Sequence, residues 1–257
     1  MWIPTWTMTS PPLAGSYRHP WQAREVATFV LVPGAGGSGW YWHRLVAELA
    51  RRGHQAVPVD LPGADPRAGL VEYRQLIVDA APHGGDPVTL VAHSLGAFSA
   101  PLACEQLAVE RLILLNPMIP QPGETAGEWW DAVGWSAEAQ ASAEREGRPE
   151  PDVTDLETLF FHDLPPDLAE VMRSGSEAAN EGPAVFAQPW PLREWPAVPT
   201  RVLAGRDDRF FPLSLQRQVA RQRLNLDIEE LPGGHLLALS QPAALATQIA
   251  PQRSPLV

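Results

Sequence analysis

LVAHSLGAFSA, residues 90–100, places Ser94 between an apolar run typical of a buried strand and an apolar run compatible with a helix. The small residues Ala92 and Gly96 lie two positions before and two positions after it, which lets a strand and a helix approach closely. A serine on such a sharp turn can stand clear of a sheet as a nucleophile. It could equally be the N-cap of the helix, and the pentapeptide alone leaves both interpretations open.

Strand-like and helix-like stretches alternate on both sides of this turn. We expect strands at 27–32, 55–60, 86–93, 111–116, 200–205 and 226–232, and helices at 40–53, 69–81, 95–108, 213–223 and 241–250. Such alternation predicts right-handed βαβ units and therefore the α/β class, with a mostly parallel central sheet flanked by helices. The carboxyl ends of parallel strands meet at one edge of the sheet, where ligands bind.

Residues 117–196 interrupt the alternation. They hold 16 of the 30 acidic residues but only 4 of the 19 basic ones, and helical pieces are expected near 124–146, 154–161 and 166–180. The interruption is too long for a simple loop, so we expect an inserted helical cap whose charge weakly repels anionic substrates. The expected organisation is an N-terminal arm at 1–25, a first core part at 26–116, the cap at 117–196 and a second core part at 197–257.

Composition excludes several classes of function. The net charge of −11 argues against nucleic-acid binding, which requires clustered positive charge. All 19 basic residues are arginine, so no lysine can form a Schiff base. No apolar run reaches the length of a membrane span, and no group of residues has the spacing of a zinc site, so neither a metal nor another cofactor is expected. The single cysteine, Cys104, cannot form an internal disulfide, which favours a cytoplasmic location.

The glycine-rich stretch GAGGSG, Gly34 to Gly39, matches the spacing G-x-G-x-x-G between an expected strand and an expected helix. Asp60 lies at the end of the next expected strand, as the ribose-binding acid does in dinucleotide-binding proteins. Pro33, directly before the first glycine, fixes φ and removes a hydrogen-bond donor at the turn. Nicotinamide binding is therefore kept as the weaker interpretation of this loop.

A serine nucleophile needs a base within reach, and that base needs a carboxylate to orient it. Downstream, AGRDDRFFP places Asp207 and Asp208 after one expected strand, and LPGGH places His235 after the next. The order serine, acid, histidine and the common location at strand ends predict a Ser-His-Asp triad with Ser94 as nucleophile and His235 as base. Either aspartate could be the acid. His93, adjacent to Ser94 on the strand, should point away from it into the core.

With these residues in place, the chain resembles the α/β-hydrolase superfamily over about residues 28–249. Within it, FVLVPGAGGSGWYWHRLVAELARRGHQAVPVDLPG is similar to the plant-esterase and hydroxynitrile-lyase-like branch and its bacterial esterase relatives. Gly205, Asp208 and Pro212 are in register with the superfamily pattern G-x-x-D-x-x-x-P. This resemblance implies that Asp208 is the acid, with Asp207 in reserve.

The resemblance also gives the glycine-rich loop a different role, since it implies an oxyanion hole formed by the backbone amides of Ala35 and Leu95. Two departures from the family are visible. The family usually has His-Gly where this chain has Pro33-Gly34, so the loop lacks an imidazole that could brace it. Hydroxynitrile lyases of this branch carry a lysine after the catalytic histidine, whereas Leu236 follows His235 here, which argues against cyanide elimination.

The expected function is that of a serine hydrolase that cleaves a small, uncharged, fairly apolar ester, thioester or lactone through an acyl-enzyme. Aromatic residues of the expected cap could line an apolar pocket or pack in the core: Trp129, Trp130, Trp135, Phe160 and Phe161. Three alternatives remain: a lyase, cyclase or perhydrolase that uses the same triad, a nicotinamide-dependent oxidoreductase that uses Gly34–Gly39, and a ligand receptor without catalysis.

Overall fold

The computed structural model describes residues 26–175 and 181–250, so the expected N-terminal arm at 1–25 lies outside the described residues. A six-stranded sheet with the order β2-β1-β3-β4-β5-β6 forms its centre, and every neighbouring pair is parallel. The strands are β1 (Thr28–Val32), β2 (Gln55–Pro58), β3 (Val88–His93), β4 (Val109–Leu115), β5 (Thr200–Gly205) and β6 (Ile228–Leu231). The expected α/β class with a parallel sheet is confirmed.

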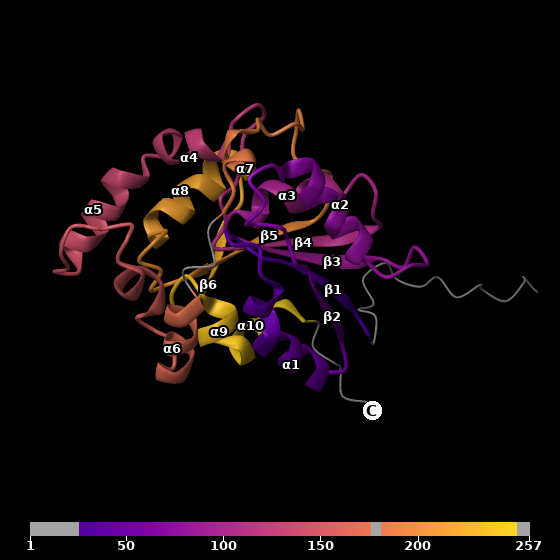
Figure 1. The fold of residues 1–257 in the computed structure, drawn as a ribbon, viewed down its shortest axis with the longest axis horizontal. Helices are drawn as coiled ribbons and strands as arrows, with labels where there is room; N and C mark the ends of the chain where they lie inside the picture. The colour runs from indigo at the N-terminus through magenta and orange to yellow at the C-terminus, as the bar shows by residue number, and fades with distance from the viewer. Residues whose placement is uncertain (1–25, 176–180, 251–257) are drawn as a thin grey trace, which may run out of the picture.

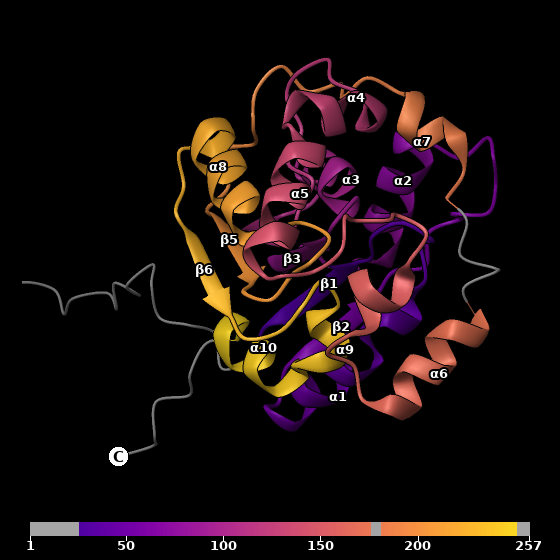
Figure 2. The ribbon, with the colours of Figure 1, turned by 90° about the vertical axis from the view of Figure 1, so that its left-hand side faces the viewer.

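Helices cover both faces of the sheet (Figure 1; Figure 2). One face carries α1 (His43–Arg51), α9 (Leu237–Ser240) and α10 (Pro242–Ile249), and the other carries α2 (Leu70–Ala80), α3 (Gly96–Ala103) and α8 (Leu213–Leu224). Alternate strand residues feed two separate cores: Val30 and Val32 pack on the side of α2 and α3, and Phe29 and Leu31 on the side of α1. Burial on both faces explains why the strands read as continuous apolar runs.

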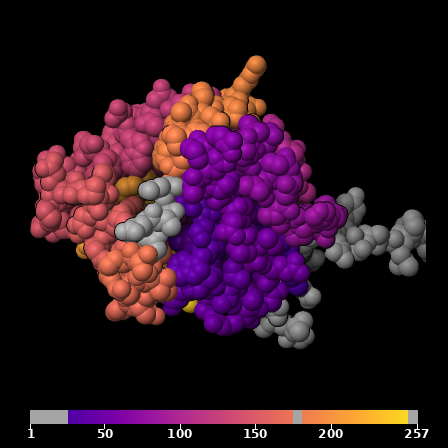
Figure 3. Space-filling view, viewed as in Figure 1, coloured from indigo at the N-terminus to yellow at the C-terminus, as the bar shows by residue number. Residues whose placement is uncertain are grey.

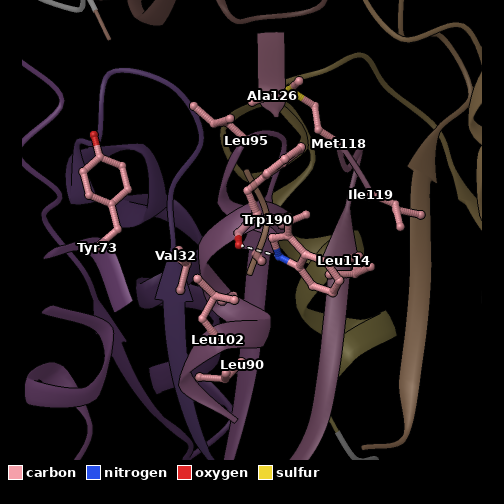
Figure 4. Packing of buried hydrophobic residues seen from close by; sticks show 14 of the residues in the cluster. Val32, Tyr73, Leu90, Leu95, Leu102, Leu114, Met118, Ile119, Ala126 and Trp190 are labelled. Atoms are coloured by element: carbon pink, nitrogen blue, oxygen red, sulfur yellow. Dashed lines mark hydrogen bonds between the residues drawn. The ribbon is translucent and has the colours of Figure 1, made fainter. Parts of the chain in front are cut away.

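Figure 4 shows the core on the side of α2 and α3, where Leu114 lies beside the indole of Trp190 and Leu102 and Leu90 lie below it in the view. The indole N–H donates to the backbone oxygen of Phe98, 3.0 Å away, so this buried polar group is paired. Trp190 belongs to the segment between β4 and β5. The contact therefore ties that segment to α3, the helix that begins directly after Ser94.

The described residues between β4 and β5, 116–175 and 181–199, form five helical elements: α4 (Ala126–Ala132), α5 (Trp135–Arg145), the π-helical turn η2 (Glu157–Phe161), α6 (Pro166–Gly175) and α7 (Pro183–Ala187). α5 and α6 lie beyond one end of the sheet in Figure 1, and face the viewer in front of it in Figure 2. Residues of this segment form one side of the molecular surface (Figure 3). The helical pieces expected near 124–146 are α4 and α5, which are separated at Gly134, whose φ of +70° is outside the range of a right-handed helix.

Several boundaries differ from the expected ones. The helix expected over 95–108 ends at Ala103, and all eight of its residues are buried. The last expected helix is preceded by the short α9, and α10 starts at Pro242 because proline suits the first helical position, where its missing N–H is not needed. The short helix α7 was not expected. Among the described helices, none combines the length and the apolar character needed to span a membrane.

Candidate active site

Ser94 lies on a strained turn between β3 and α3. Its φ is +50°, in the left-handed region that costs an L-residue about 1–2 kcal/mol. Its N–H donates to the oxygen of Leu115 at 3.0 Å, and its backbone oxygen accepts from the N–H of Met118 at 3.1 Å. A Cβ on Gly96 would lie 2.5 Å from the oxygen of Pro33, so the residue two positions after Ser94 has to be glycine. The turn thus holds the serine in a defined position at the sheet edge.

Asp208 and His235 form a buried pair at the ends of β5 and β6. Asp208 Oδ2 lies 2.8 Å from His235 Nδ1. Its other oxygen, Oδ1, accepts from the backbone N–H groups of Phe210 and Phe211 at 2.9 and 2.8 Å. Because a carboxylate accepts, Nδ1 carries the proton and Nε2 keeps a lone pair that can accept a proton.

Asp207, the reserve candidate for the acid, has a different partner. Its Oδ2 accepts from the N–H of Gly233 at 3.0 Å, in the loop that precedes His235. Asp208 is therefore the aspartate that contacts the imidazole, and Asp207 supports the loop that carries it.

The backbone of His235 is held by two buried side chains. Its carbonyl oxygen accepts from Nδ2 of Asn116 at 2.8 Å and lies 3.0 Å from Nε2 of His93. Asn116 is fully buried, directly follows β4 with a φ of +43°, and accepts through Oδ1 from the N–H of Gly205 at 2.7 Å. It thus links the ends of three strands. Sequence reasoning missed this role, although an asparagine directly after an apolar strand was a visible signal.

His93 lies in the core, 5 % exposed, with its ring stacked on Tyr41 at 4.5 Å between centroids. Its ring centroid is also 4.7 Å from that of His235. Since a carbonyl only accepts, the proton of His93 is on Nε2, where it binds the oxygen of His235. Burial, and then the nearby imidazole of His235, lower the pKa of His93 well below its ordinary value.

Ser94 and His235 are connected through His93, the residue before Ser94, whose ring contacts the His235 ring. Both side chains are almost fully buried. Within residues 26–175 and 181–250, no hydrogen bond joins Ser94 Oγ to the His235 imidazole, a contact that in catalytic sites often tightens only when substrate binds.

Two backbone amides beside Ser94 are available to a ligand. In the described part of the chain, neither Ala35 N–H nor Leu95 N–H donates to a protein acceptor. A Cβ on Gly34 would lie 3.0 Å from Ser94 Cβ, so the glycine-rich loop passes directly by the serine. Two free amides in this location can bind a developing oxyanion.

The glycine-rich loop differs in detail from a dinucleotide-binding turn. Asp60, the residue that would bind a ribose, accepts through Oδ1 from the N–H of Gly39 at 2.7 Å. The loop also leads into a 3-10 turn, η1 (Gly39–Trp42), before α1 begins at His43. The α-helix N-terminus that a pyrophosphate requires is thus displaced from the glycines.

An aromatic shell surrounds the candidate base. The rings of Phe160, Phe210 and Phe211 lie edge-on to His235, with centroids 5.3, 5.2 and 5.0 Å away. Trp130 packs on Phe210 and Phe211, and Trp135 packs on Trp130. Phe210 and Phe211 were not among the expected pocket residues, although they directly follow the aspartates in the sequence.

The other expected pocket residues lie deeper. Trp129 is 1 % exposed, and its indole N–H donates to the oxygen of Ile119. Phe161 packs in the core on the opposite side of the sheet, with α1 and α9. Of the five aromatic residues named for the pocket, Phe160 is the one whose ring contacts the His235 ring among the described residues.

The segment between β4 and β5 also contacts the loops that carry the acid and the base. His162 Nε2 lies 3.1 Å from the oxygen of Asp207, and Asp163 Oδ2 accepts from the N–H of Gly234 at 2.6 Å. His162 and Asp163 share no hydrogen bond with each other in the described chain. Burial lowers the pKa of His162 below its ordinary value. The described residues contain no group of histidine, cysteine and carboxylate side chains placed to hold a metal ion.

Comparison with known proteins agrees with this geometry. Residues 29–248 match the model of the alpha/beta hydrolase family. "Probable esterase PIR7A" from Oryza sativa subsp. indica is 36% identical over 110 residues, which cover 38% of this chain and 42% of the rice protein. "Norfluorocurarine synthase 1" from Strychnos sp is 37% identical over 86 residues, or 30% of this chain and 32% of that protein. The matches thus span less than half of the length of these two plant relatives.

A solved structure resembles the fold over a longer stretch. Polyneuridine aldehyde esterase superposes with a TM-score of 0.68 at 20% sequence identity and covers 86% of this chain and 97% of its own. At this identity the superposition shows a common fold. Together with the matches to plant proteins, it confirms the resemblance to the plant-esterase branch.

Proposed function

The chain belongs to the alpha/beta hydrolase family, and from this premise we propose that it is a serine esterase acting through the triad Ser94, His235 and Asp208. The proposed substrate is a small, uncharged, fairly apolar carboxylic ester, thioester or lactone. The resemblance of one part of the chain to a rice protein named a probable esterase supports the proposal.

The proposed reaction follows from the positions of these groups. Ser94 Oγ attacks the carbonyl carbon, its proton passes to His235 Nε2, and Asp208 stabilises the resulting imidazolium through Nδ1–H. The amides of Ala35 and Leu95 bind the oxyanion of the tetrahedral intermediate. The intermediate collapses to an acyl-Ser94, and the leaving alkoxide or thiolate takes the proton from His235. Water then repeats the sequence with His235 as base, which releases the acid and restores Ser94.

The observation that carries the proposal is the buried Asp208–His235 hydrogen bond at the sheet edge where Ser94 sits at a positive φ. A small fluorophosphonate tests it, because it reacts with activated serines. We expect stoichiometric label at Ser94, located by peptide mass mapping, with no label in Ser94→Ala and slower labelling in His235→Ala. A folded wild-type protein that takes no label would refute the proposal and favour a non-catalytic receptor.

The apolar character of the proposed substrate is supported by the aromatic shell of Phe160, Phe210 and Phe211 around His235. Phe160→Ala should raise KM for an ester with a medium-length acyl chain more than for an acetate ester. The exposed Trp40 packs on His43, and among the described residues its ring has no contact with the His235 ring, so Trp40→Ala serves as the control and should change neither value. An equal effect of Phe160→Ala on both esters would argue against acyl-chain binding at this residue.

A non-hydrolytic reaction on the same triad is the second candidate, because one relative carries the name of a synthase. A lyase, cyclase or perhydrolase could keep Ser94, His235 and Asp208 unchanged. Product analysis separates the two: a hydrolase gives the free acid and alcohol in water, and an added acceptor nucleophile diverts the acyl group only if a transfer reaction competes with hydrolysis.

A further inference from the structure

The glycine-rich loop is bound by a carboxylate from a distant part of the chain. Glu181 Oε2 accepts from the N–H of Gly36 at 2.6 Å, across 145 positions of sequence. Its other oxygen, Oε1, accepts from the hydroxyl of Tyr73 on α2. Both carboxylate oxygens are thus used, one by the loop and one by the core. Gly36 directly follows Ala35, the residue whose amide we assign to the oxyanion hole.

The conformation of this loop depends on contacts from outside it, among them the N–H of Leu61, which donates to the oxygen of Gly37 at 2.7 Å. Gly36 and Gly37 have φ values of +85° and +70°, and glycine populates both signs of φ, so the peptide units here can rotate at small cost. Pro33 provides no N–H to this turn. The turn is closed internally by one hydrogen bond, Gly37 N–H to Gly34 O, at the long distance of 3.2 Å.

The residue after Glu181 provides a second attachment. Gly182 N–H donates to the oxygen of Gly63 at 2.6 Å. Gly63 lies directly against the glycine-rich loop, since a Cβ on it would be 2.8 Å from the carbonyl carbon of Gly36. Glu181 is therefore held in register with the loop, and its carboxylate has little freedom to bind elsewhere.

We propose that Glu181 is a positioning residue for the oxyanion hole: it binds Gly36 N–H and so holds the loop in the conformation that leaves Ala35 N–H free for the oxyanion. The inference rests on the proposed esterase function and assigns the contact that holds this loop in place. Tyr73 supports the same contact by fixing the other carboxylate oxygen.

The negative charge of Glu181 would weaken oxyanion binding, whereas its hydrogen bond with Gly36 N–H supports it. A carboxylate this close to the hole repels the oxyanion that forms there, and burial raises the pKa of Glu181 above its ordinary value. Positioning and charge make different predictions for two conservative variants. Glu181→Gln keeps an oxygen at the same reach without the charge, whereas Glu181→Asp keeps the charge on a side chain one methylene shorter that no longer reaches Gly36.

The test measures kcat and KM for a short neutral ester, and the second-order rate constant of fluorophosphonate labelling at Ser94, in wild type and both variants. Loss of an oxyanion-hole donor lowers kcat by about 100- to 1,000-fold. For an indirect effect we expect about a tenfold lower kcat and labelling rate in Glu181→Asp, with KM within about twofold, and values near wild type in Glu181→Gln. Glu72→Gln is the control, since Glu72 accepts from the N–H of Gly69 on the same side and does not touch the loop.

The outcomes separate the positioning role of Glu181 from the esterase activity of Ser94. Glu181→Asp as fast as wild type, or Glu181→Gln as slow as Glu181→Asp, would overturn the positioning role even though wild type is labelled at Ser94. No label in wild type would refute the esterase proposal, and the positioning role with it. Melting temperatures of all variants are measured in parallel, because a variant that is destabilised as a whole would lose activity without any specific change in the glycine-rich loop.

Discussion

Asp208 and His235 are joined by a 2.8 Å hydrogen bond inside an apolar shell. The carboxylate of Asp208 is also bound by backbone N–H groups, and the backbone of His235 is bound by neighbouring side chains. Asp208 Oδ1 binds two consecutive N–H groups, and the carbonyl oxygen of His235 is bound by Asn116 and His93. The imidazole therefore has one orientation and one tautomer before any substrate arrives. Such preorganisation is what a general base needs in order to act without rearrangement.

The first prediction separates the two aspartates. Asp208→Asn should lower kcat of ester hydrolysis by about 10⁴-fold, because an amide at this position favours the wrong tautomer of His235. Asp207→Asn should lower it less than about fivefold, since an amide oxygen can still accept from Gly233 N–H. Steady-state kinetics on both purified variants checks this. Equal losses would mean that the acid is shared or misassigned.

The second prediction concerns the strain at Ser94. Its φ of +50° suits glycine better than any other residue, so Ser94→Gly should exceed Ser94→Ala in free energy of unfolding by about 1 kcal/mol. Both variants lose the hydroxyl, which makes them a matched pair. Urea denaturation followed by circular dichroism measures the difference. If Ser94→Ala were the more stable of the two, the turn would carry no backbone strain.

The third prediction concerns stability in acid. The pKa of His93 is lowered in the folded state, so the unfolded chain binds its proton more readily, and stability is lost as the pH falls below 6.5, the ordinary value. The loss from this residue is at most about 1.4 kcal/mol per pH unit. His93→Gln should therefore flatten the decline in unfolding free energy between pH 7 and pH 5. Parallel curves for wild type and variant would show that His93 titrates normally.

The fourth prediction concerns substrate charge. The acidic segment between β4 and β5 should make kcat/KM lower for a coenzyme A thioester than for a neutral thioester with the same acyl chain. Salt screens such long-range repulsion, so the ratio of the two values should move towards one as ionic strength rises from about 0.01 M to about 1 M. A higher kcat/KM for the anion at low salt would contradict the prediction.

Sequence reasoning was strongest where function depends on local pattern. Ser94, His235 and the pair Asp207 and Asp208 were named because each follows a strand, and the parallel sheet brings these strand ends to one edge. The choice of Asp208 over Asp207 came from the resemblance to the family pattern. Their assignment as a triad stays a prediction until labelling and kinetics test it. The alternation of apolar runs was also sufficient for the six strands.

The residues that support the site could not be found in this way. Asn116 binds His235 across 119 positions, and Glu181 binds Gly36 across 145. No spacing in the chain encodes these pairs, because they depend on how separately formed loops pack against each other. Phe210 and Phe211 directly follow the aspartates in the sequence. Their contact with the site nevertheless depends on tertiary packing, since Phe210 packs on Phe160 of η2 and both residues directly precede α8 and its N-cap, Pro212.

The arrangement of the strand ends has a consequence for folding. Ser94 sits early in the chain, and His235 is attached after β6, the last strand to be made and an edge of the sheet. The two can meet only after the long connection between β4 and β5 has closed, which is an entropically slow step. Reactivity of the serine should therefore appear late during refolding, after most helical signal has returned, and so report when the edge strand docks.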